Sequence, residues 1–288
     1  MMTLREAMQD ALRRNVAVGH FNISDSSQLN GIAAAARELG VPVVIGVSEG
    51  EREFVGLKKT VAMVQAAREE FGIDIFTNAD HTETVEGCVA AIDAGFDSVI
   101  FDGTKLSVEE NIAQTKAVVA YAKESGRDVI VEGEVGYIGT SCKVLDDVPD
   151  AVLNSVLPSP DDVAVFIEAT GVDAVAPAVG NLHGMLKGRT NPNLNIELVT
   201  TIRQRIGNDM GVVLHGGSGI TDEDFTKAIR AGMNVVHINT EIRVAYRKGI
   251  EAALAANADE VAPYRYLDKG RDAVMDVVRQ RLQLFNKL

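Results

Sequence analysis

The chain has 288 residues, of which 46% are hydrophobic and 24% are charged, and its formal net charge is −13. So acidic a chain is a poor candidate for binding nucleic acid or an anionic membrane through its overall field. A local cationic pocket for a phosphorylated metabolite remains compatible with this charge.

Cysteine usage and the N-terminal sequence bear on the compartment. Cys88 and Cys142 are the two cysteines, and they form neither a disulfide framework nor a CxxC pair, so we expect a reducing cytoplasm. The first 15 residues have the pattern of an amphipathic helix without the apolar core of a signal peptide. Apolar runs stay short of the roughly 20 residues that span a membrane.

Eight Val/Ile-rich segments follow one another along the chain, and each precedes a helical pattern. They cover residues 16–22, 41–48, 74–81, 97–103, 128–134, 172–180, 211–217 and 234–240. Strands buried on both faces and alternating with helices are typical of parallel sheets. The pattern predicts a single domain over 1–288, an α/β fold of the (β/α)8 TIM barrel type. A doubly wound open sheet is the alternative, but eight repeats and an N-terminal capping helix favour closure.

Local signals place several helix ends. Ser107 and Thr221 have the pattern of N-caps, and glycines such as Gly40 and Gly171 follow helical stretches. Residues 271–285 predict an extra C-terminal helix that packs on a neighbouring element or on a second subunit. The longest irregular stretch, 135–160, is of a length that is usually functional or mobile.

Polar residues gather at the carboxyl ends of the predicted strands, where barrel enzymes hold their active sites. All five histidines of the chain are among them. A lone histidine in such a place is more often structural, but five at one face favour a metal or acid–base site. The residues are His20, Asn22, Ser48, Asp80, His81, Asp102, Glu132, Glu134, His183, His215, His237 and Asn239.

Three of the histidines come from different strand ends. His81, His183 and His215 could converge over the barrel mouth as three neutral imidazoles with one open position, which is typical of catalytic zinc. Glu134 and Asp102 offer a second or alternative metal site. Glu132 shares a face with Glu134, and a salt-bridge role inside the barrel is equally compatible with its position.

Two loops near the C-terminus have the character of a phosphate site. "HGGSGIT" follows the seventh predicted strand and "HINTEI" lies at the end of the eighth, where barrels often bind phosphate. Gly216, Gly217 and Gly219 would expose backbone N–H groups, and Ser218, Asn239 and Thr240 would add side-chain donors. A glycine-rich turn with helix caps is the alternative. A metal and a phosphate at one mouth suit a metal-assisted reaction of a phosphorylated sugar.

Several motifs together resemble the class II, metal-dependent fructose-/tagatose-bisphosphate aldolases. They are Phe21–Asn22, "ADH" at 79–81, "GFDSVIFDGTKLSVEENIAQTKAVVAYA" from Gly95, "VEGEVG" at 131–136, "HGM" at 183–185 and "LHGGSG" at 214–219. They occur in the family's order, and the resemblance covers about residues 4–284.

The resemblance implies roles for these residues. His81, His183 and His215 would be the Zn²⁺ ligands, and Asp102 and Glu134 would hold a second or displaced metal, divalent or monovalent. Asp80 would transfer the proton of the aldehyde oxygen. Zn²⁺ would polarise the ketone and stabilise the dihydroxyacetone phosphate enediolate, without a lysine Schiff base. The substrate and its phosphate would contact Asn22, Gly184, Lys187, Gly216, Gly217, Ser218, His237, Asn239 and Thr240. A homodimer or homotetramer is also implied.

The sequence departs from the family pattern at three places. Thr82 stands where the family has glycine, and His237 stands where it has an asparagine that contacts the enediolate. The loop after the fifth strand lacks the family's Glu-Asp pair, and Asp146 and Asp147 are the nearest replacements for its proton-transferring carboxylate. Lys187, Arg189 and Arg271 are unranked candidates for binding a second phosphate.

The leading hypothesis is therefore a zinc-dependent aldolase that cleaves or forms a ketose 1-phosphate or 1,6-bisphosphate. A related aldolase with a different aldehyde half is one alternative. Another is a metal-dependent hydrolase on the same barrel, with Asp80 activating water. A third is a non-catalytic member that stabilises a partner, a reading based on His237 and the altered loop.

Overall fold

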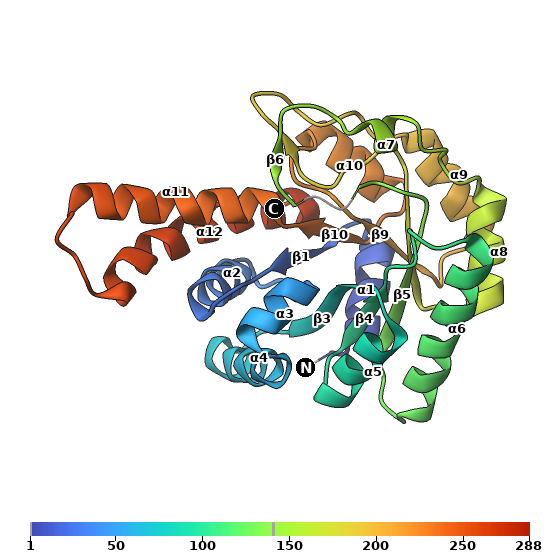
Figure 1. Cartoon of the computed structure of the whole chain (residues 1–288), viewed down its shortest axis with the longest axis horizontal. Helices are drawn as coiled ribbons and strands as arrows, with labels where there is room; N and C mark the ends of the chain where they lie inside the picture. The colour runs from blue at the N-terminus through green and yellow to red at the C-terminus, as the bar shows by residue number, and fades with distance from the viewer. Residues whose placement is uncertain (1, 140–141) are drawn as a thin grey trace.

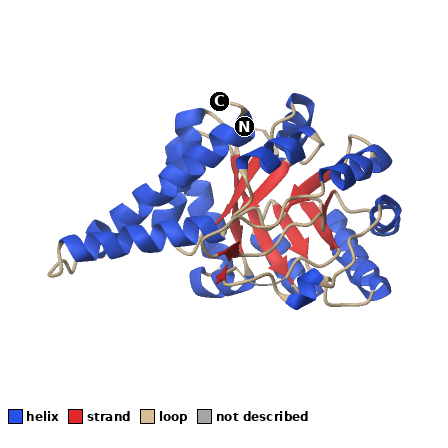
Figure 2. Cartoon of the chain, turned by 90° about the horizontal axis from the view of Figure 1, so that it is seen from above, coloured by secondary structure: helices blue, strands red, loops and turns tan. Residues whose placement is uncertain are grey.

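Eight parallel strands close into a barrel in the computed structural model, which describes residues 2–139 and 142–288. Figures 1 and 2 show the barrel, around which the strands follow the order β1-β10-β9-β7-β5-β4-β3-β2. Their bounds are β1 Val18–Asn22, β2 Val43–Val47, β3 Ile75–Thr82, β4 Ser98–Phe101, β5 Ile130–Val135, β7 Ala174–Pro177, β9 Gly211–Leu214 and β10 Val235–Ile238. Each lies in a predicted segment or extends one residue beyond it, so the barrel is confirmed over the open sheet.

Helices follow the strands and cover the outside of the barrel (Figure 2). They are α2 Ser26–Leu39, α3 Glu49–Val55, α4 Leu57–Phe71, α5 Val85–Ala94, α6 Val108–Glu124, α8 Pro160–Thr170, α9 Ile196–Ile206 and α10 Asp222–Arg230. The predicted caps are confirmed: Ser107 accepts a hydrogen bond from the backbone N–H of Glu110, and Thr221 accepts one from that of Asp224. The short helix α3 was not predicted, and it contributes two residues to the site described below.

The N-terminal helix α1, Leu4–Arg14, closes the end of the barrel opposite to the strand ends that carry the polar residues. Its Leu4 and Met8 pack in a cluster with barrel-interior residues such as Val18, Phe76 and Ile130. This apolar plug leaves the carboxyl ends of the strands as the open mouth, which is where barrel enzymes place their chemistry.

The described part of the segment predicted to be irregular, 135–160, contains two short elements. Strand β6, Val144–Leu145, pairs in parallel with β8, Met185–Leu186, and helix α7 covers Asp150–Leu153. The two-stranded sheet ties the loop after β5 to the loop after β7 across the barrel mouth. Its pairs are too short to show a strand periodicity in the sequence.

The C-terminal part forms a long helical hairpin that projects from the barrel (Figures 1 and 2). Its helices are α11, Thr240–Ala256, and α12, Pro263–Asn286, and the second begins earlier than the predicted 271–285. Helix α12 packs on α2 and α11, so the extra helix packs within its own chain. A side chain at Gly249 would overlap the carbonyl of Lys269, so glycine permits this close contact. In the described part of the chain, no helix has the length and apolar character to cross a membrane.

Candidate active site

The end of β3 is kinked, and the kink turns two adjacent side chains toward one mouth. The register with β4 shifts between Ala79 and Thr82, and His81 has a φ of 46°. A non-glycine residue in this left-handed region costs about 1–3 kcal/mol, so the surroundings must hold it. Because the positive φ falls on His81, a side chain at Thr82 meets no such strain. Its hydroxyl donates to the carbonyl of Ala79 at 3.3 Å, which closes the kink.

Arg52 of α3 holds this kink from outside the strand. Its guanidinium donates to the carbonyl of Asp80 at 3.0 Å and to the hydroxyl of Thr82 at 3.0 Å, and it also reaches the carbonyl of Val47 at 2.6 Å. The side chain is 8% exposed. Thr82, which departs from the family pattern, therefore helps to hold the kinked end of β3 through its bonds with Arg52 and Ala79.

Substituting Arg52 by methionine is expected to lower the free energy of unfolding by roughly 2–3 kcal/mol, because buried acceptors lose a charged donor. Urea unfolding followed by circular dichroism measures this change. Lys58→Met on the exposed part of α4 is the control. An unchanged midpoint for the Arg52 variant would contradict a role in holding the kink.

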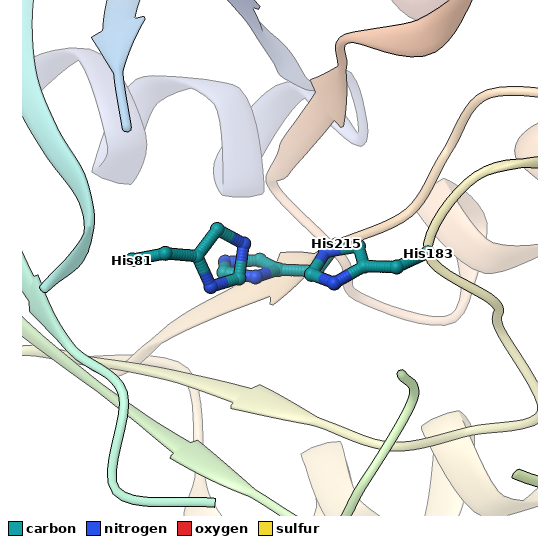
Figure 3. Close-up of side chains that lie close together, drawn as sticks. All are labelled: His81, His183 and His215. Carbon is teal, nitrogen blue, oxygen red and sulfur yellow. The ribbon is translucent and has the colours of Figure 1, made fainter. Parts of the chain in front are cut away.

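His81, His183 and His215 converge at the mouth, as Figure 3 shows, with one nitrogen of each within 4.8 Å of the others. The ring centroid of His81 lies 4.5 Å from that of His183 and 5.0 Å from that of His215. His183 follows β7 at some distance, in the loop that leads to β8, and its Nδ1 donates to the carbonyl of Gly139 at 2.8 Å. His215 directly follows β9, and its Nε2 donates to Glu132 at 2.7 Å.

For His183 and His215, these contacts indicate which ring nitrogen is free for a metal. With Nδ1 of His183 bound to a carbonyl, Nε2 is the free atom, and with Nε2 of His215 bound to Glu132, Nδ1 is free. Within the described residues, Nδ1 of His215 is buried without a hydrogen-bond partner, and the nearest carboxylate atom, Oε1 of Glu134, lies 3.5 Å away. Buried ligand atoms without a partner and outer atoms bound to oxygen fit a metal site.

Two carboxylates lie on the other side of His81. Its Nδ1 is 3.0 Å from Oδ2 of Asp102 and 2.9 Å from Oε1 of Glu134, and these three residues form a second cluster that could hold an ion. Burial lowers the pKa of His81, but the charges of Asp80 and Glu134 outweigh it, so this pKa lies well above the usual range. A field that retains a proton on an imidazole also attracts a cation.

Asp80 lies beside the three histidines and off their shared centre. Its Oδ2 accepts a hydrogen bond from Nδ2 of Asn22 at 2.8 Å, while its buried Oδ1 has no such bond among the described residues and lies 3.6 Å from Nδ1 of His237. Burial raises the pKa of Asp80, but the positive charge of His81 and the neighbouring imidazoles of His237 and His20 outweigh it. The pKa lies well below the usual range, so the group is a carboxylate.

Three imidazoles stack across the barrel interior. His20 and His237 lie opposite each other on paired strands, with centroids 3.5 Å apart and planes 2° apart, and His215 lies 4.2 Å from His237 on the other side. Burial lowers the pKa of His20 to about 4 and keeps that of His237 well below its usual value. His20 lies under the mouth, so it supports the stack, whereas His237 reaches the pocket.

The predicted phosphate loops meet at the same mouth. The hydroxyl of Ser218 accepts from the backbone N–H groups of Asn239, at 3.3 Å, and Glu241, at 3.2 Å, and so joins the loop after β9 to the start of α11. The cavity there is lined by Asn22, Asp80, His81, Cys142, His183, Gly184, Gly216, Ser218, His237, Asn239 and Thr240. Gly217 packs behind it, where its N–H donates to the carbonyl of His237 at 2.9 Å.

Other predicted residues lie away from this cavity. Asp146 is 3.9 Å from Lys187 and Asp147 pairs with Arg189, with exposed fractions of 95% and 81% for the two carboxylates. Arg271 pairs with Asp268 and Asp272 on the helical hairpin. The two loop aspartates and the three candidate cations all lie outside the lining of the pocket. Each of them pairs with an exposed group elsewhere.

Sequence reasoning missed four residues of the site, one of which is Arg52, described above. Cys142 lines the cavity, and its Sγ lies 3.7 Å from Nδ2 of Asn239. Glu51 and Arg243 form an ion pair behind Asn22. The S-x-x-E capping box from Ser48 to Glu51 was a local signal for the position of Glu51 at a helix start. Arg243 carried no such signal.

The whole chain matches one family of known proteins. Residues 2–288 match the family model described as fructose-bisphosphate aldolase class-II. The chain belongs to this family. It is 36% identical to the fructose-bisphosphate aldolase of Geobacillus stearothermophilus, over 99% of the chain and 96% of the relative. It is 35% identical to that of Staphylococcus aureus strain N315, over 99% and 97%.

A solved structure agrees with the sequence matches. The YdjI aldolase from Escherichia coli K12 superposes with a TM-score of 0.82 at 29% identity, covering 99% of this chain and 97% of that one. The class II aldolases are metal-dependent, which agrees with the three converging histidines. The chain is thus a class II aldolase, and the predicted family, fold and enzyme class are confirmed. A hydrolase on this barrel lacks comparable support.

Proposed function

We propose that this class II aldolase uses Zn²⁺ and cleaves a ketose 1-phosphate or 1,6-bisphosphate, of the fructose- or tagatose-bisphosphate kind, to dihydroxyacetone phosphate and an aldehyde. The observation that carries the proposal is one cavity with His81, His183, Asp80 and the loops of Ser218 and Thr240 in its lining. His81, His183 and His215 would hold the ion. When bound, Zn²⁺ polarises the ketone of the substrate.

The loops after β9 and β10 would bind the phosphate of the donor half. The cavity lining includes Gly184, Gly216, Ser218, Asn239 and Thr240. Thr240 begins α11, so the positive end of the helix dipole faces the same place. This arrangement would stabilise a phosphate dianion in a chain whose overall charge repels anions.

Asp80 would transfer the proton of the aldehyde oxygen. In cleavage, its carboxylate takes the proton of the hydroxyl on the carbon that becomes the aldehyde, while the electron pair of the broken C–C bond forms the enediolate. In condensation, the same proton returns to the aldehyde oxygen. Asn22 orients the carboxylate from one side. His237, neutral and adjacent, would donate a hydrogen bond to an enediolate oxygen.

Further roles follow from the resemblance and are proposed with it. Asp102 and Glu134 would hold a second divalent or monovalent cation. Either Asp146 or Asp147 could exchange the carbon-bound proton of the donor only after a movement of their loop, since both are exposed. A second phosphate would recruit Lys187, Arg189 or Arg271 by a similar movement or from another subunit of a homodimer or homotetramer. Few cysteines and an acidic charge fit a cytoplasmic enzyme.

Chelation is the direct test of the proposed metal. Dialysis against a strong chelator is expected to abolish formation of dihydroxyacetone phosphate from fructose 1,6-bisphosphate, and Zn²⁺ is expected to restore it, because three histidines without a cation cannot polarise the ketone. A coupled assay for dihydroxyacetone phosphate measures both steps, with Mg²⁺ as the matched ion. Product formation that persists after complete removal of zinc would contradict the metal mechanism.

A further inference from the structure

Glu51 and Arg243 form an ion pair immediately behind the proposed acid/base. Glu51 lies in the first turn of α3, and Arg243 lies in the first turn of α11. The glutamate side chain is 6% exposed, and the arginine side chain is 36% exposed. Neither residue is among those that line the catalytic cavity.

One amide joins this pair to Asp80. Nδ2 of Asn22 donates to Oε2 of Glu51 at 2.9 Å and to Oδ2 of Asp80 at 2.8 Å, which uses both of its N–H groups. Flipping the amide would point its oxygen at two carboxylates. Glu51 therefore fixes which way the Asn22 amide faces, and the amide in turn holds one oxygen of Asp80.

Glu51 is itself held on both of its oxygens. Oε2 accepts from the backbone N–H of Ser48 at 2.8 Å and from its hydroxyl at 2.9 Å, and Oε1 pairs with Arg243. Arg243 neutralises one of two carboxylates that share a single amide. Without the arginine, Glu51 would be a buried charge without a counter-ion next to Asp80, which is costly.

We propose that Glu51 and Arg243 are positioning residues for the C–C bond step, acting on Asp80 through Asn22. The pair also connects two parts of the reaction, because Arg243 lies in the same first turn as Thr240, where α11 begins at the proposed phosphate loop. The helix that would bind the donor phosphate thus holds the acid/base that serves the aldehyde half. This inference rests on the proposed aldolase function.

Two reactions of the same enzyme separate positioning from general damage. Cleavage of fructose 1,6-bisphosphate requires the proton transfer by Asp80. Exchange of the carbon-bound proton of dihydroxyacetone phosphate with solvent involves no aldehyde oxygen, so it does not require that transfer. A variant that only misplaces Asp80 loses the first reaction and keeps the second, whereas a variant with a damaged site or lost zinc loses both.

The variants are Arg243→Gln, Arg243→Lys, Glu51→Gln and the double Glu51→Gln/Arg243→Gln, each assayed as the zinc-loaded enzyme with its zinc content measured. Arg247→Gln is the matched control, since Arg247 lies one turn further along α11, is 81% exposed and pairs with Glu251. Cleavage is followed by the coupled assay, and exchange by the loss of deuterium from labelled dihydroxyacetone phosphate in water.

Arg243→Gln is expected to lower kcat for cleavage about 10- to 100-fold, since a displacement near 1 Å costs this much, while KM and the exchange rate change less than about 3-fold. Arg243→Lys keeps the charge and is expected to recover most of the loss. The double variant is expected to be less impaired than Arg243→Gln, because no unpaired carboxylate remains and glutamine still accepts from Asn22 and Ser48. Arg247→Gln should match the wild type.

Equal losses of cleavage and exchange in Arg243→Gln would show general damage and overturn the positioning role. Unchanged cleavage would overturn it as well. A zinc-loaded wild type that neither cleaves ketose phosphates nor exchanges the proton of dihydroxyacetone phosphate would instead refute the proposed function itself, so the two failures are distinguishable.

Discussion

Asp80→Asn is expected to lower kcat for cleavage of fructose 1,6-bisphosphate by about 10³-fold, within the range typical for loss of a general acid or base. The amide has the shape of the carboxylate and can stay beside Asn22, but it cannot take the hydroxyl proton. Because Asp80 lies off the centre shared by the three histidines, zinc content should remain at the wild-type level. Steady-state kinetics and metal analysis of the purified variant measure the two quantities.

In Asp80→Asn, the rate at which deuterium exchanges between dihydroxyacetone phosphate and water should stay within about tenfold of the wild-type rate. Loss of a general acid or base mainly slows the step that uses it, and this exchange does not use Asp80. Asp161→Asn, at an exposed carboxylate that pairs with Arg205 on the helical surface, provides the control for a changed charge. If exchange fell as far as cleavage, Asp80 would act on the donor half or on the metal, and its assignment would be wrong.

His215→Ala is expected to abolish both reactions and to remove zinc from the purified protein. The imidazole is 1% exposed, and its Nδ1 is the buried atom left free by the bond from Nε2 to Glu132. Its removal also leaves Glu132 without the imidazole that donates to it. Zinc affinity is measured by competition with a chromophoric chelator. Changing a residue that only hydrogen-bonds to a metal ligand typically lowers affinity by about 10–100-fold, and the loss expected for His215→Ala is larger.

Glu132→Gln tests the same metal site as His215→Ala with a smaller change. It keeps an oxygen near Nε2 of His215 but removes the charge, so a loss within about 10–100-fold is expected for zinc affinity, with both reactions restored at high zinc. Stoichiometric zinc together with full activity in His215→Ala would be incompatible with the proposed ligand set.

Most of the site could be predicted from strand ends alone. The carboxyl ends of parallel barrel strands meet at one face, so polar residues there converge although they are distant in the sequence. His81, His183 and His215 follow this rule, and the structure brings them together. The glycines and Ser218 after β9 follow it too, because tight backbone turns that expose N–H groups have a recognisable composition.

The support of Asp80 could not be predicted in the same way. Regular strand alternation places Asp80 and His81 on opposite faces, and only the irregular pairing with β4 and the positive φ of His81 turn both to the mouth. The contact of Glu51 with Arg243 joins residues 192 positions apart, and a short helix that lacks a clear apolar periodicity places one of them. Such pairs depend on the distance between elements after closure.

The exposed positions of Asp146 and Asp147 depended on the tertiary structure for a similar reason. Their loop pairs its short strand β6 with β8 across the mouth, and this pairing turns both carboxylates to surface cations while Cys142 faces the cavity. Proximity in sequence to a catalytic loop therefore did not predict proximity to the site.

The sequence by itself determined the barrel, the strand ends that carry the chemistry and the three histidines, since periodicity, caps and turn residues are local properties of the chain. Only the tertiary structure decided which nitrogens of His183 and His215 form hydrogen bonds and how His20 stacks on His237. It also decided that Glu51 and Arg243 contact Asp80 through Asn22. Hydrogen bonds and ring contacts form only at distances of a few ångströms. Closure of the barrel and the kink at His81 bring these side chains within such distances, and neither can be read from local sequence patterns.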